Sequence, residues 1–366
     1  MSASRVVVAG GHSAGHIEPA MNFADALRRL EPDAEITALG TVRGLDTTLI
    51  PARGYPLELI PPVPLQRKIN GALLATPRKL RDSVRATRAV LERVQAEVVV
   101  GFGGYVAMPA YIAARRLDIP IVVHEANARP GVANRVAARL TTHVFTASPA
   151  VKLAHATAVG IPLRPAIAGL DRAALRAAAR ARFGLDPDGP VLMVTGGSQG
   201  ARAINTAVSG SAGALRAAGV QVLHITGPAN VVEVPAGSPP YVVVPYVDEM
   251  QYAYAAADLV VCRSGAMTCA ELTAVGLPAV YVPLPLRGGE QRHNAEPIAR
   301  AGGALIVDND EFTSSWIDAN LLPLITDPAR LSAMSRAASA RGSRNADVVL
   351  ADHVLVVVRE RRRFAS

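Results

Sequence analysis

Near its start the chain reads Val6-Val7-Val8-Ala9-Gly10-Gly11-His12-Ser13-Ala14-Gly15-His16, an apolar run that turns through glycines into an alanine-rich segment. More than 180 residues later the pattern returns as Val191-Leu192-Met193-Val194-Thr195-Gly196-Gly197-Ser198-Gln199-Gly200-Ala201-Arg202. Residues 10–16 are the first glycine loop and residues 196–201 the second. Each stretch predicts a strand, a glycine turn and a helix. The first turn of such a helix presents free N–H groups and a positive dipole end, so each loop is predicted to bind an anion.

Short Val-, Ile- and Leu-rich runs alternate with longer helical patterns through both halves of the chain. Apolar strands separated by helices are typical of parallel sheets covered on both faces, so the predicted fold is α/β with two doubly wound, Rossmann-like domains. Two such domains, each headed by a glycine loop, predict a GT-B architecture in which they face each other across a cleft. The strands are expected at Arg5–Gly10, Glu35–Gly40, Glu97–Phe102, Pro120–Val123, His143–Thr146, Val191–Thr195, Gln221–Ile225, Tyr241–Val244, Leu259–Cys262 and Ala279–Val282.

Two prolines punctuate the pattern at Gly160-Ile161-Pro162-Leu163-Arg164-Pro165 and indicate a domain boundary. We expect an N-terminal domain of residues 1–163 and a C-terminal domain of residues 164–344. Residues 345–366 are helical by pattern and are expected to pack back on the N-terminal domain.

The bulk composition limits the possible classes of protein. The formal net charge of +8 implies an acidic partner without choosing among nucleic acid, lipid headgroups and anionic substrates. Two cysteines, Cys262 and Cys269, cannot form a zinc site and are expected in the core. The most apolar window, Val98 to Ala114, is too short and too glycine-rich to span a membrane, and no signal peptide is evident. The pattern therefore indicates a soluble cytoplasmic protein.

A third strand–turn–helix pattern lies at residues 258–272. Gly265 is expected to make the turn, and the helix is expected to begin near Ala266. Small residues there would admit a phosphate, and the carboxylate of Glu271 can accept both hydroxyls of a ribose. The alternative is a helix cap at Thr268 and a surface acid at Glu271. Beside the second glycine loop, the ribose interpretation is favoured.

Five motifs, in this order, make the chain resemble the MurG family: Gly10-Gly11-His12-Ser13-Ala14-Gly15-His16, Gly101-Phe102-Gly103-Gly104-Tyr105, His124-Glu125-Ala126-Asn127, Gly196-Gly197-Ser198-Gln199-Gly200-Ala201 and Cys262-Arg263-Ser264-Gly265-Ala266-Met267-Thr268-Cys269-Ala270-Glu271. The resemblance implies an inverting glycosyltransferase that uses no cofactor. It would move GlcNAc from UDP-N-acetylglucosamine (UDP-GlcNAc) to the 4-hydroxyl of MurNAc in the undecaprenyl-linked acceptor lipid I. The product would be lipid II, for peptidoglycan synthesis.

The resemblance also implies which residues meet the substrates. Those expected at the donor are Ser13, Ala14, Gly15, Asn127, Arg164, Ser198, Val247, Ala266, Met267, Thr268, Cys269, Ala270, Glu271 and Gln291. Tyr105 and Asn134 are expected on the acceptor side. Two departures from the commoner family pattern are Ser13-Ala14 for Thr-Gly and Glu290 for a second Gln.

The attacking hydroxyl needs a general base, and three residues are candidates. His16 closes a glycine loop and titrates near neutral pH; its alternative role is only to shape the loop. His124 and Glu125 end another strand, so either one is a second candidate for the base or for the group that orients it. No bound metal is expected, because Asp308-Asn309-Asp310 follows a late strand and is predicted to form a turn and helix cap.

The segment Arg67–Arg93 holds eight Lys and Arg against two Asp and Glu, beside the apolar residues 61–65. Together with the implied lipid-linked acceptor, it predicts peripheral docking on the anionic inner leaflet, at the cytoplasmic face of the cell membrane. The alternative is a solvated helix face. Cell-wall assembly proteins are further candidate partners. Nucleic acid is not expected, because the basic segment has no interleaved aromatic residues.

Other functions fit parts of the pattern. A nicotinamide oxidoreductase is disfavoured because the first loop is not Gly-x-Gly-x-x-Gly and the second strand ends Leu39-Gly40-Thr41 without an acid. A UDP-GlcNAc 2-epimerase and a catalytically silent UDP-sugar-binding protein share the fold and remain alternatives. The epimerase would need no acceptor, and the silent protein would transfer nothing.

Overall fold

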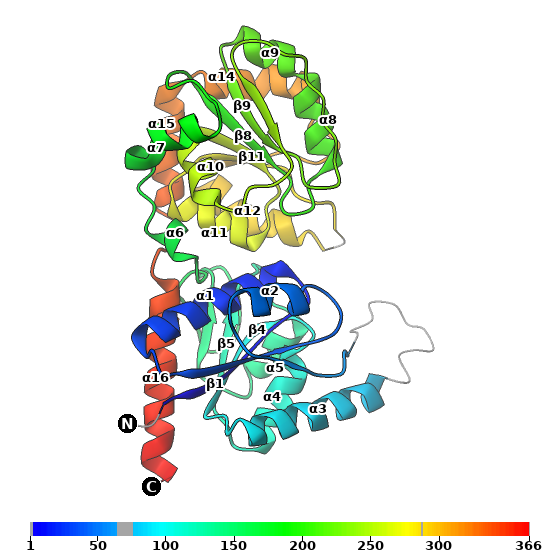
Figure 1. Cartoon of the computed structure of the whole chain (residues 1–366), viewed down its shortest axis with the longest axis vertical. Helices are drawn as coiled ribbons and strands as arrows, with labels where there is room; N and C mark the ends of the chain where they lie inside the picture. The colour runs from blue at the N-terminus through cyan, green and yellow to red at the C-terminus, as the bar shows by residue number, and fades with distance from the viewer. Residues whose placement is uncertain (1–2, 64–75, 287, 366) are drawn as a thin grey trace. The chain divides into compact units, whose positions relative to one another are not determined.

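The computed structural model describes residues 3–63, 76–286 and 288–365. The chain forms two compact units: unit 1 is Met1–Leu163 with Arg344–Ser366, and unit 2 is Arg164–Ser343. Each unit has one parallel sheet with helices packed on it (Figure 1). Part of the predicted basic segment, including Arg67 and Lys68, lies outside the described residues, as do Pro64-Leu65.

The sheet of unit 1 has seven parallel strands in the order β3-β2-β1-β4-β5-β6-β7. These strands are β1 (Arg5–Gly10), β2 (Glu35–Gly40), β3 (Leu57–Leu59), β4 (Val98–Gly103), β5 (Ile121–Glu125), β6 (Val144–Thr146) and β7 (Ala156–Ala158). The helices of this unit are α1 (Ala14–Leu30), α2 (Asp46–Ala52), α3 (Thr76–Arg93), α4 (Ala107–Arg116), α5 (Val132–Ala137) and α16 (Ala346–Ala365).

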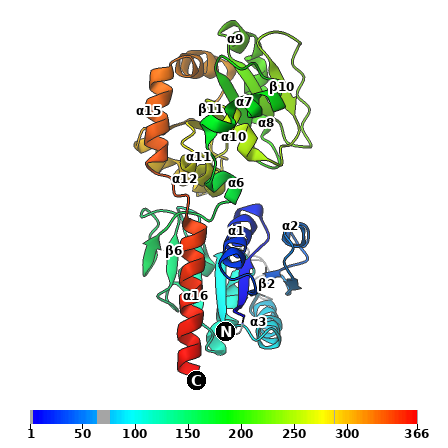
Figure 2. The same cartoon turned by 60° about the vertical axis from the view of Figure 1, so that its left-hand side comes forward.

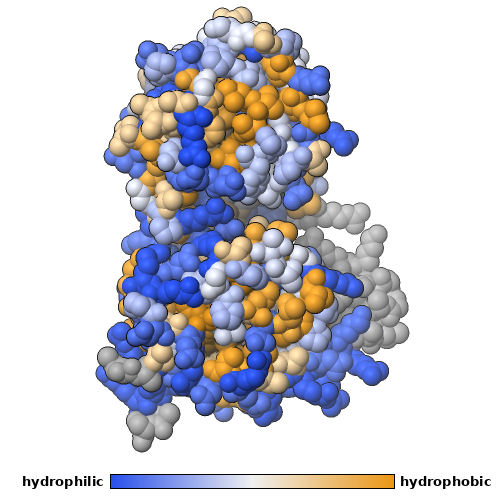
Figure 3. Space-filling model, viewed as in Figure 1, coloured by the Kyte–Doolittle hydropathy of each residue, from blue (hydrophilic) through white to orange (hydrophobic). Residues whose placement is uncertain are grey.

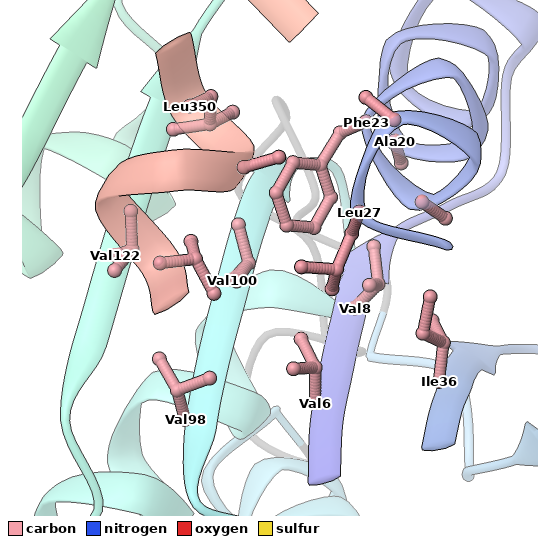
Figure 4. Packing of buried hydrophobic residues seen from close by; sticks show 14 of the residues in the cluster. Val6, Val8, Ala20, Phe23, Leu27, Ile36, Val98, Val100, Val122 and Leu350 are labelled. Carbon is pink, nitrogen blue, oxygen red and sulfur yellow. The ribbon is translucent and has the colours of Figure 1, made fainter. Parts of the chain in front are cut away.

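Alternate side chains of β1 enter two different cores. Val6 and Val8 pack in a cluster with Phe23 of α1 and Leu350 of α16 (Figure 4). Val7 points to the other face and packs in a cluster formed with α3, α4 and α5. Because both faces are covered, the strand is apolar from Val6 to Ala9. Burial of a side chain as large as Phe23 contributes about 1.5–3 kcal/mol.

The last helix returns to unit 1 after the chain has completed unit 2. Figures 1 and 2 show α16 beside α1. Near its start, Asp347 accepts a 2.6 Å hydrogen bond from Arg29 of α1. Near its end, Arg362 donates to both carboxylate oxygens of Glu97, at 2.6 and 2.8 Å. The helix is therefore held by its apolar face and by an ion pair at each end.

The sheet of unit 2 has six parallel strands in the order β10-β9-β8-β11-β12-β13. These strands are β8 (Val191–Thr195), β9 (Gln221–Ile225), β10 (Tyr241–Val244), β11 (Leu259–Cys262), β12 (Ala279–Tyr281) and β13 (Ala304–Ile306). The helical elements are α6 (Pro165–Ala168), α7 (Arg172–Arg182), α8 (Arg202–Gly210), α9 (Ala212–Ala217), α10 (Met250–Ala256), α11 (Ala266–Ala274), α12 (Glu290–Arg300), α13 (Ser314–Trp316), the π-helix η2 (Ile317–Leu321), α14 (Leu322–Ile325) and α15 (Pro328–Ser339).

Side-chain caps set the start of two helices in unit 2. Asp171 accepts a 3.1 Å hydrogen bond from the N–H of Ala174 and begins α7. Asp327 accepts a 2.9 Å bond from the N–H of Arg330 and begins α15. Each aspartate satisfies a first-turn donor that has no partner inside the helix, and such caps are worth about 1 kcal/mol.

Candidate functional site

The strand order of each sheet reverses direction at one point. In unit 1 this point lies between β1 and β4, and in unit 2 between β8 and β11. The connections that leave the two strands there diverge, which opens a crevice at the carboxyl ends of the strands, where open α/β sheets bind ligands. The first glycine loop follows β1 and the second follows β8, so each loop borders the crevice of its own unit.

The first glycine loop leads into α1 through Ser13, which is the N-cap residue and is exposed. Ala14 and Gly15 form the first turn, whose N–H groups precede the helical hydrogen-bond pattern. The hydroxyl of Ser13 lies 2.9 Å from Nδ1 of His16. Tyr105, which follows β4, contacts the loop edge-on, with 4.9 Å between its ring centroid and that of His12.

His16 lies beside Gly103, at the border of the unit 1 crevice. A Cβ on Gly103, the last residue of β4, would lie 3.3 Å from Nε2 of His16 and 3.4 Å from Nδ2 of Asn134. The missing side chain at Gly103 therefore lets His16 and Asn134 approach the same point. The pKa of His16 is lowered, first by burial and then by His12, while Asp46 raises it. The imidazole is neutral at neutral pH and can accept a proton.

His124, a second candidate for the base, lies in the interior of unit 1. Its side chain is fully buried, its Nε2 lies 2.8 Å from the carbonyl oxygen of Gly160, and its ring packs against Phe102. Burial lowers the pKa of His124 to about 4. His124 is therefore a neutral, buried residue that joins β5 to the segment before unit 2.

Glu125 is also buried, and its carboxylate is occupied by donors from its own unit. Oε1 accepts a 2.9 Å hydrogen bond from the N–H of Asn127. Oε2 accepts a 2.9 Å bond from the N–H of Gly131 and a 3.0 Å bond from Nδ2 of Asn134. Asn134 in turn accepts from the hydroxyl of Tyr111 at 2.7 Å. Glu125 thus shapes the turn between β5 and α5, an arrangement that favours the predicted orienting role over that of a base.

The second glycine loop is held close to the end of β9. Gly200 has φ +73, and a Cβ on it would lie 2.0 Å from the carbonyl oxygen of Thr226, so only glycine fits this position. Ser198 lies at the exposed tip of the loop. The loop leads to α8, which begins at Arg202, so its backbone is arranged as a turn before a helix N-terminus.

The helix after β11 begins at Ala266, with Gly265 as its N-cap, so the first-turn N–H groups of Ala266, Met267 and Thr268 face the unit 2 crevice. Ala270 is half-buried. Cys269 is buried, and burial raises the pKa of its thiol to about 12. Its side chain belongs to the core, as predicted for both cysteines, so only its backbone is available to a ligand.

Glu271 is half-buried and fixed by a tyrosine. Its carboxylate accepts a 2.7 Å hydrogen bond from the hydroxyl of Tyr254 on α10. The pKa of Tyr254 is raised, first by burial and then by Glu271, while the charge of Arg164 acts in the opposite direction. Arg164, the N-cap of α6, therefore lies in the field of this pair.

Two other predicted residues of unit 2 are Gln291 and Val247. Gln291 is in the first turn of α12, and its Oε1 accepts a 2.9 Å bond from the N–H of Leu284. Its side-chain amide is thereby held at the carboxyl side of β12. Val247 lies half-buried in the loop between β10 and α10. The predicted residues of each unit thus gather at the carboxyl edge of that unit's sheet.

Asp308-Asn309-Asp310 forms a turn, in which the carbonyl of Asp308 accepts from the N–H groups of Glu311 and Phe312. The predicted cap is wrong, because Thr313 caps the following helix. Within the part of the chain that the structure describes, no group of three or more His, Cys, Asp or Glu side chains is arranged to hold a metal ion.

Comparisons with known proteins agree over nearly the whole chain. The glycosyltransferase family 28 N-terminal domain matches residues 6–146, and the family 28 C-terminal domain matches residues 191–350. A relative from Saccharopolyspora erythraea is 60% identical over 358 residues, covering 97% of this chain and 94% of its own. One from Streptomyces avermitilis is 56% identical over 363 residues, covering 98% and 99%. Both are named UDP-N-acetylglucosamine--N-acetylmuramyl-(pentapeptide) pyrophosphoryl-undecaprenol N-acetylglucosamine transferase.

The crystal structure of MurG from Acinetobacter baumannii matches with a TM-score of 0.74 at 25% identity, covering 98% of this chain and 99% of that one. The chain belongs to the MurG family. The calicheamicin glycosyltransferase CalG4 matches at 17% identity with a TM-score of 0.68, which shows a likeness of fold alone. Membership of the MurG family confirms the predicted GT-B fold with two Rossmann-like domains.

Three residues of this MurG family site escaped the sequence analysis. Asp46 was missed because the search for an acid stopped at the end of β2, and this acid begins the next helix. Tyr254 looked like an ordinary apolar residue of an amphipathic helix. Ser264, which follows β11, has a buried Oγ without a hydrogen-bond partner in the described part of the chain. The available signal was the place of Ser264 in the strand–turn–helix pattern of residues 258–272.

Proposed function

We propose that this chain transfers GlcNAc from UDP-GlcNAc to the 4-hydroxyl of MurNAc in lipid I and so makes lipid II. The observation that carries the proposal is that each unit has a crevice and that the two crevices differ in their chemistry. The crevice of unit 1 holds a neutral histidine, and that of unit 2 holds helix N-termini beside a tyrosine-bound carboxylate. Relatives that are 56% and 60% identical carry the name of this transferase.

Unit 2 is assigned the donor. The N–H groups at the start of α11, the second glycine loop with Ser198, and Arg164 would stabilise the diphosphate, and Glu271 would accept the ribose hydroxyls. The buried hydroxyl of Ser264 lies at the carboxyl end of β11 and offers a further group to the donor. Val247 is assigned to the uracil and Gln291 to the hydroxyls of GlcNAc. Each of these assignments gives a residue the role that the MurG family implies for its motif position.

Unit 1 is assigned the acceptor and the chemistry. The acceptor oxygen attacks the anomeric carbon, the bond from that carbon to the diphosphate breaks, and the configuration inverts. The proton of the hydroxyl passes to Nε2 of His16, while Ser13 orients the ring through Nδ1. The negative charge that develops on UDP is met by helix N-termini and Arg164. Asn127, Asn134 and Tyr105 are assigned to the sugars at this side.

Docking of unit 1 on the anionic inner leaflet is part of the proposal. Along α3 the side chains of Arg78, Lys79, Arg81, Arg85 and Arg88 are exposed. Figure 3 shows a mostly hydrophilic surface where α3 lies in Figure 1. No helix in the described ranges is long and apolar enough to cross a bilayer. Substituting Arg81 and Arg85 by Glu is expected to reduce cosedimentation with anionic vesicles, with little effect on neutral ones.

The test is transfer of labelled GlcNAc from UDP-GlcNAc to a lipid I analogue. Acceptor-dependent product, with UDP released in equal amount, is expected. Turnover of UDP-GlcNAc without any acceptor would instead identify an epimerase. Binding of UDP-GlcNAc with no product for any lipid-linked acceptor would identify a silent binding protein, and either result would overturn the proposal.

A further inference from the structure

Asp46 is a fully buried carboxylate at the start of α2 that none of the assigned substrate contacts uses. One oxygen accepts a 2.6 Å hydrogen bond from the N–H of His12. The other accepts a 2.8 Å bond from the N–H of Thr41 and lies 3.3 Å from its hydroxyl. A single side chain thus ties the first glycine loop to the end of β2 and to the first turn of α2.

The loop that Asp46 holds is in a conformation that a non-glycine residue rarely adopts. His12 has φ +77, a left-handed value that costs about 1–2 kcal/mol for a residue with a side chain. A second bond, from the N–H of Leu45 to the carbonyl of His12, joins the same two segments at 3.2 Å. A residue stays in such a conformation only when its surroundings fix it, and here the restraint comes from residues 45 and 46.

The restrained residue is next to the group assigned to the chemistry. Ser13 follows His12 directly and contacts Nδ1 of His16, so a shift of the loop moves both. The charged groups whose fields act on His16 are His12, from the same loop, and Asp46, from α2. On the opposite side lies Asn134, whose Nδ2 donates a hydrogen bond to Glu125. Glu125 therefore acts on the site through Asn134.

We propose that Asp46 is the positioning residue that fixes the first glycine loop and holds His16 in place to accept the proton of the acceptor hydroxyl. This inference rests on the proposed function for the identity of the reaction, and on the hydrogen bonds of Asp46 for the rest. Asp46 touches no substrate. It acts through His12 on the shape of the loop and through its charge on His16.

The test compares Asp46→Asn with Asp25→Asn. Asp25 is a carboxylate of the same unit that accepts from Tyr55 and Arg53, so its substitution controls for loss of a hydrogen-bonded charge. For Asp46→Asn we expect a loss of kcat of about tenfold or more, with the KM for UDP-GlcNAc nearly unchanged. Removing a negative charge near His16 also shifts the acid limb of the kcat profile to lower pH. Asp25→Asn is expected to change neither.

The titration of His16 is followed separately by NMR of its ring carbons, assigned with His16→Gln. In Asp46→Asn the midpoint is expected to move to lower pH. A kcat within twofold of wild type, or an unmoved midpoint, would overturn the inference. Failure of the wild type to use a lipid-linked acceptor would overturn the proposed function instead, while the NMR titration would still test the action of Asp46 on His16.

A second variant serves if Asp46→Asn does not fold. Glycine adopts a positive φ without restraint, so His12→Gly removes the strain that Asp46 offsets. The titration of His16 is then compared between the single variant His12→Gly and the double variant that also carries Asp46→Asn. The midpoint of His16 is expected to be lower in the double variant, and equal midpoints would contradict the assignment.

Discussion

The first and second glycine loops follow the first strand of two sheets whose central strands have the same order. They differ in the side chains around them. The first loop carries His16 in contact with Ser13 and rests on the buried Asp46. The second has no titratable residue between Gly196 and Ala201 and is shaped by close backbone contacts. The same topology therefore supplies a glycine turn before a helix twice, and only the first loop adds an ionisable side chain, to which we assign the proton transfer.

The largest effect on the second loop is expected from Gly200→Ala. The new Cβ would meet the carbonyl oxygen of Thr226 at 2.0 Å, in a backbone region with φ +73. The combined steric and backbone cost is about 3 kcal/mol, measured as the free energy of unfolding by denaturant titration. The affinity for UDP-GlcNAc should fall with it.

Gly197→Ala is the matched control, because Gly197 has φ +85 and open space around its Cβ position. Its cost is expected to be about 1 kcal/mol, from the backbone alone. Equal losses for the two variants would show that close packing of the loop does not set its shape.

In unit 1 the corresponding effect is expected from Glu125→Ala. The change leaves the buried amide Nδ2 of Asn134 and the N–H groups of Asn127 and Gly131 without this acceptor, at a cost of about 2 kcal/mol in stability. Glu125→Gln keeps the shape but replaces one acceptor oxygen by a donor, so it should also lose stability. If Glu125→Gln were fully stable and inactive, a proton-transfer role for Glu125 would be restored and the comparison between the loops would need revision.

Glu271→Ala and Tyr254→Phe test the assignment of donor binding to unit 2. Loss of the carboxylate should raise the KM for UDP-GlcNAc about tenfold with kcat nearly unchanged, because it removes binding that the ground state and the transition state share. Tyr254→Phe removes the 2.7 Å bond that orients Glu271, so it should raise KM less. A fall in kcat with constant KM in either variant would place these residues in the chemistry.

The smallest effect is expected at the docking of α16. Burial raises the pKa of Glu97, but the hydrogen bonds from Arg362 and Arg5 outweigh it, and the net pKa lies below the ordinary 4.5. A lowered pKa gives stability that is present above the unfolded-state value and is lost as the pH falls through the folded-state value. Glu97→Gln should cost about 1 kcal/mol at neutral pH and nothing in strong acid. A cost independent of pH would show that the charge of Glu97 does not hold the helix.

The long apolar strands were predictable because they are buried on both faces. Six strands, including β1 and β8, have the predicted bounds. The strands β4 and β5 were misplaced by one or two residues, and β6 begins one residue later than predicted. The three-residue strands β3, β7 and β13 were missed, because none of them is fully buried and each lacks the continuous apolar run of a central strand. β12 is one residue shorter than predicted.

The site was only partly predictable. Motifs order residues along a sequence but do not reveal burial, so His124 stayed a second candidate for the base beside His16. In the structure one lies inside the core and the other borders the crevice. Asp46 and Tyr254 act through hydrogen bonds to distant segments, which no local pattern shows. The roles carried from the family remain predictions for the individual residues.

The most direct test of the difference between the loops is the single-turnover rate of transfer to a lipid I analogue with UDP-GlcNAc saturating, for wild type and His16→Ala. The affinity for UDP-GlcNAc is measured on the same samples. We expect the rate to fall by about 10²–10⁴ while the affinity stays within about twofold. A rate within a few fold of wild type, or a loss explained by weaker donor binding, would contradict the assignment of the chemistry to the first loop.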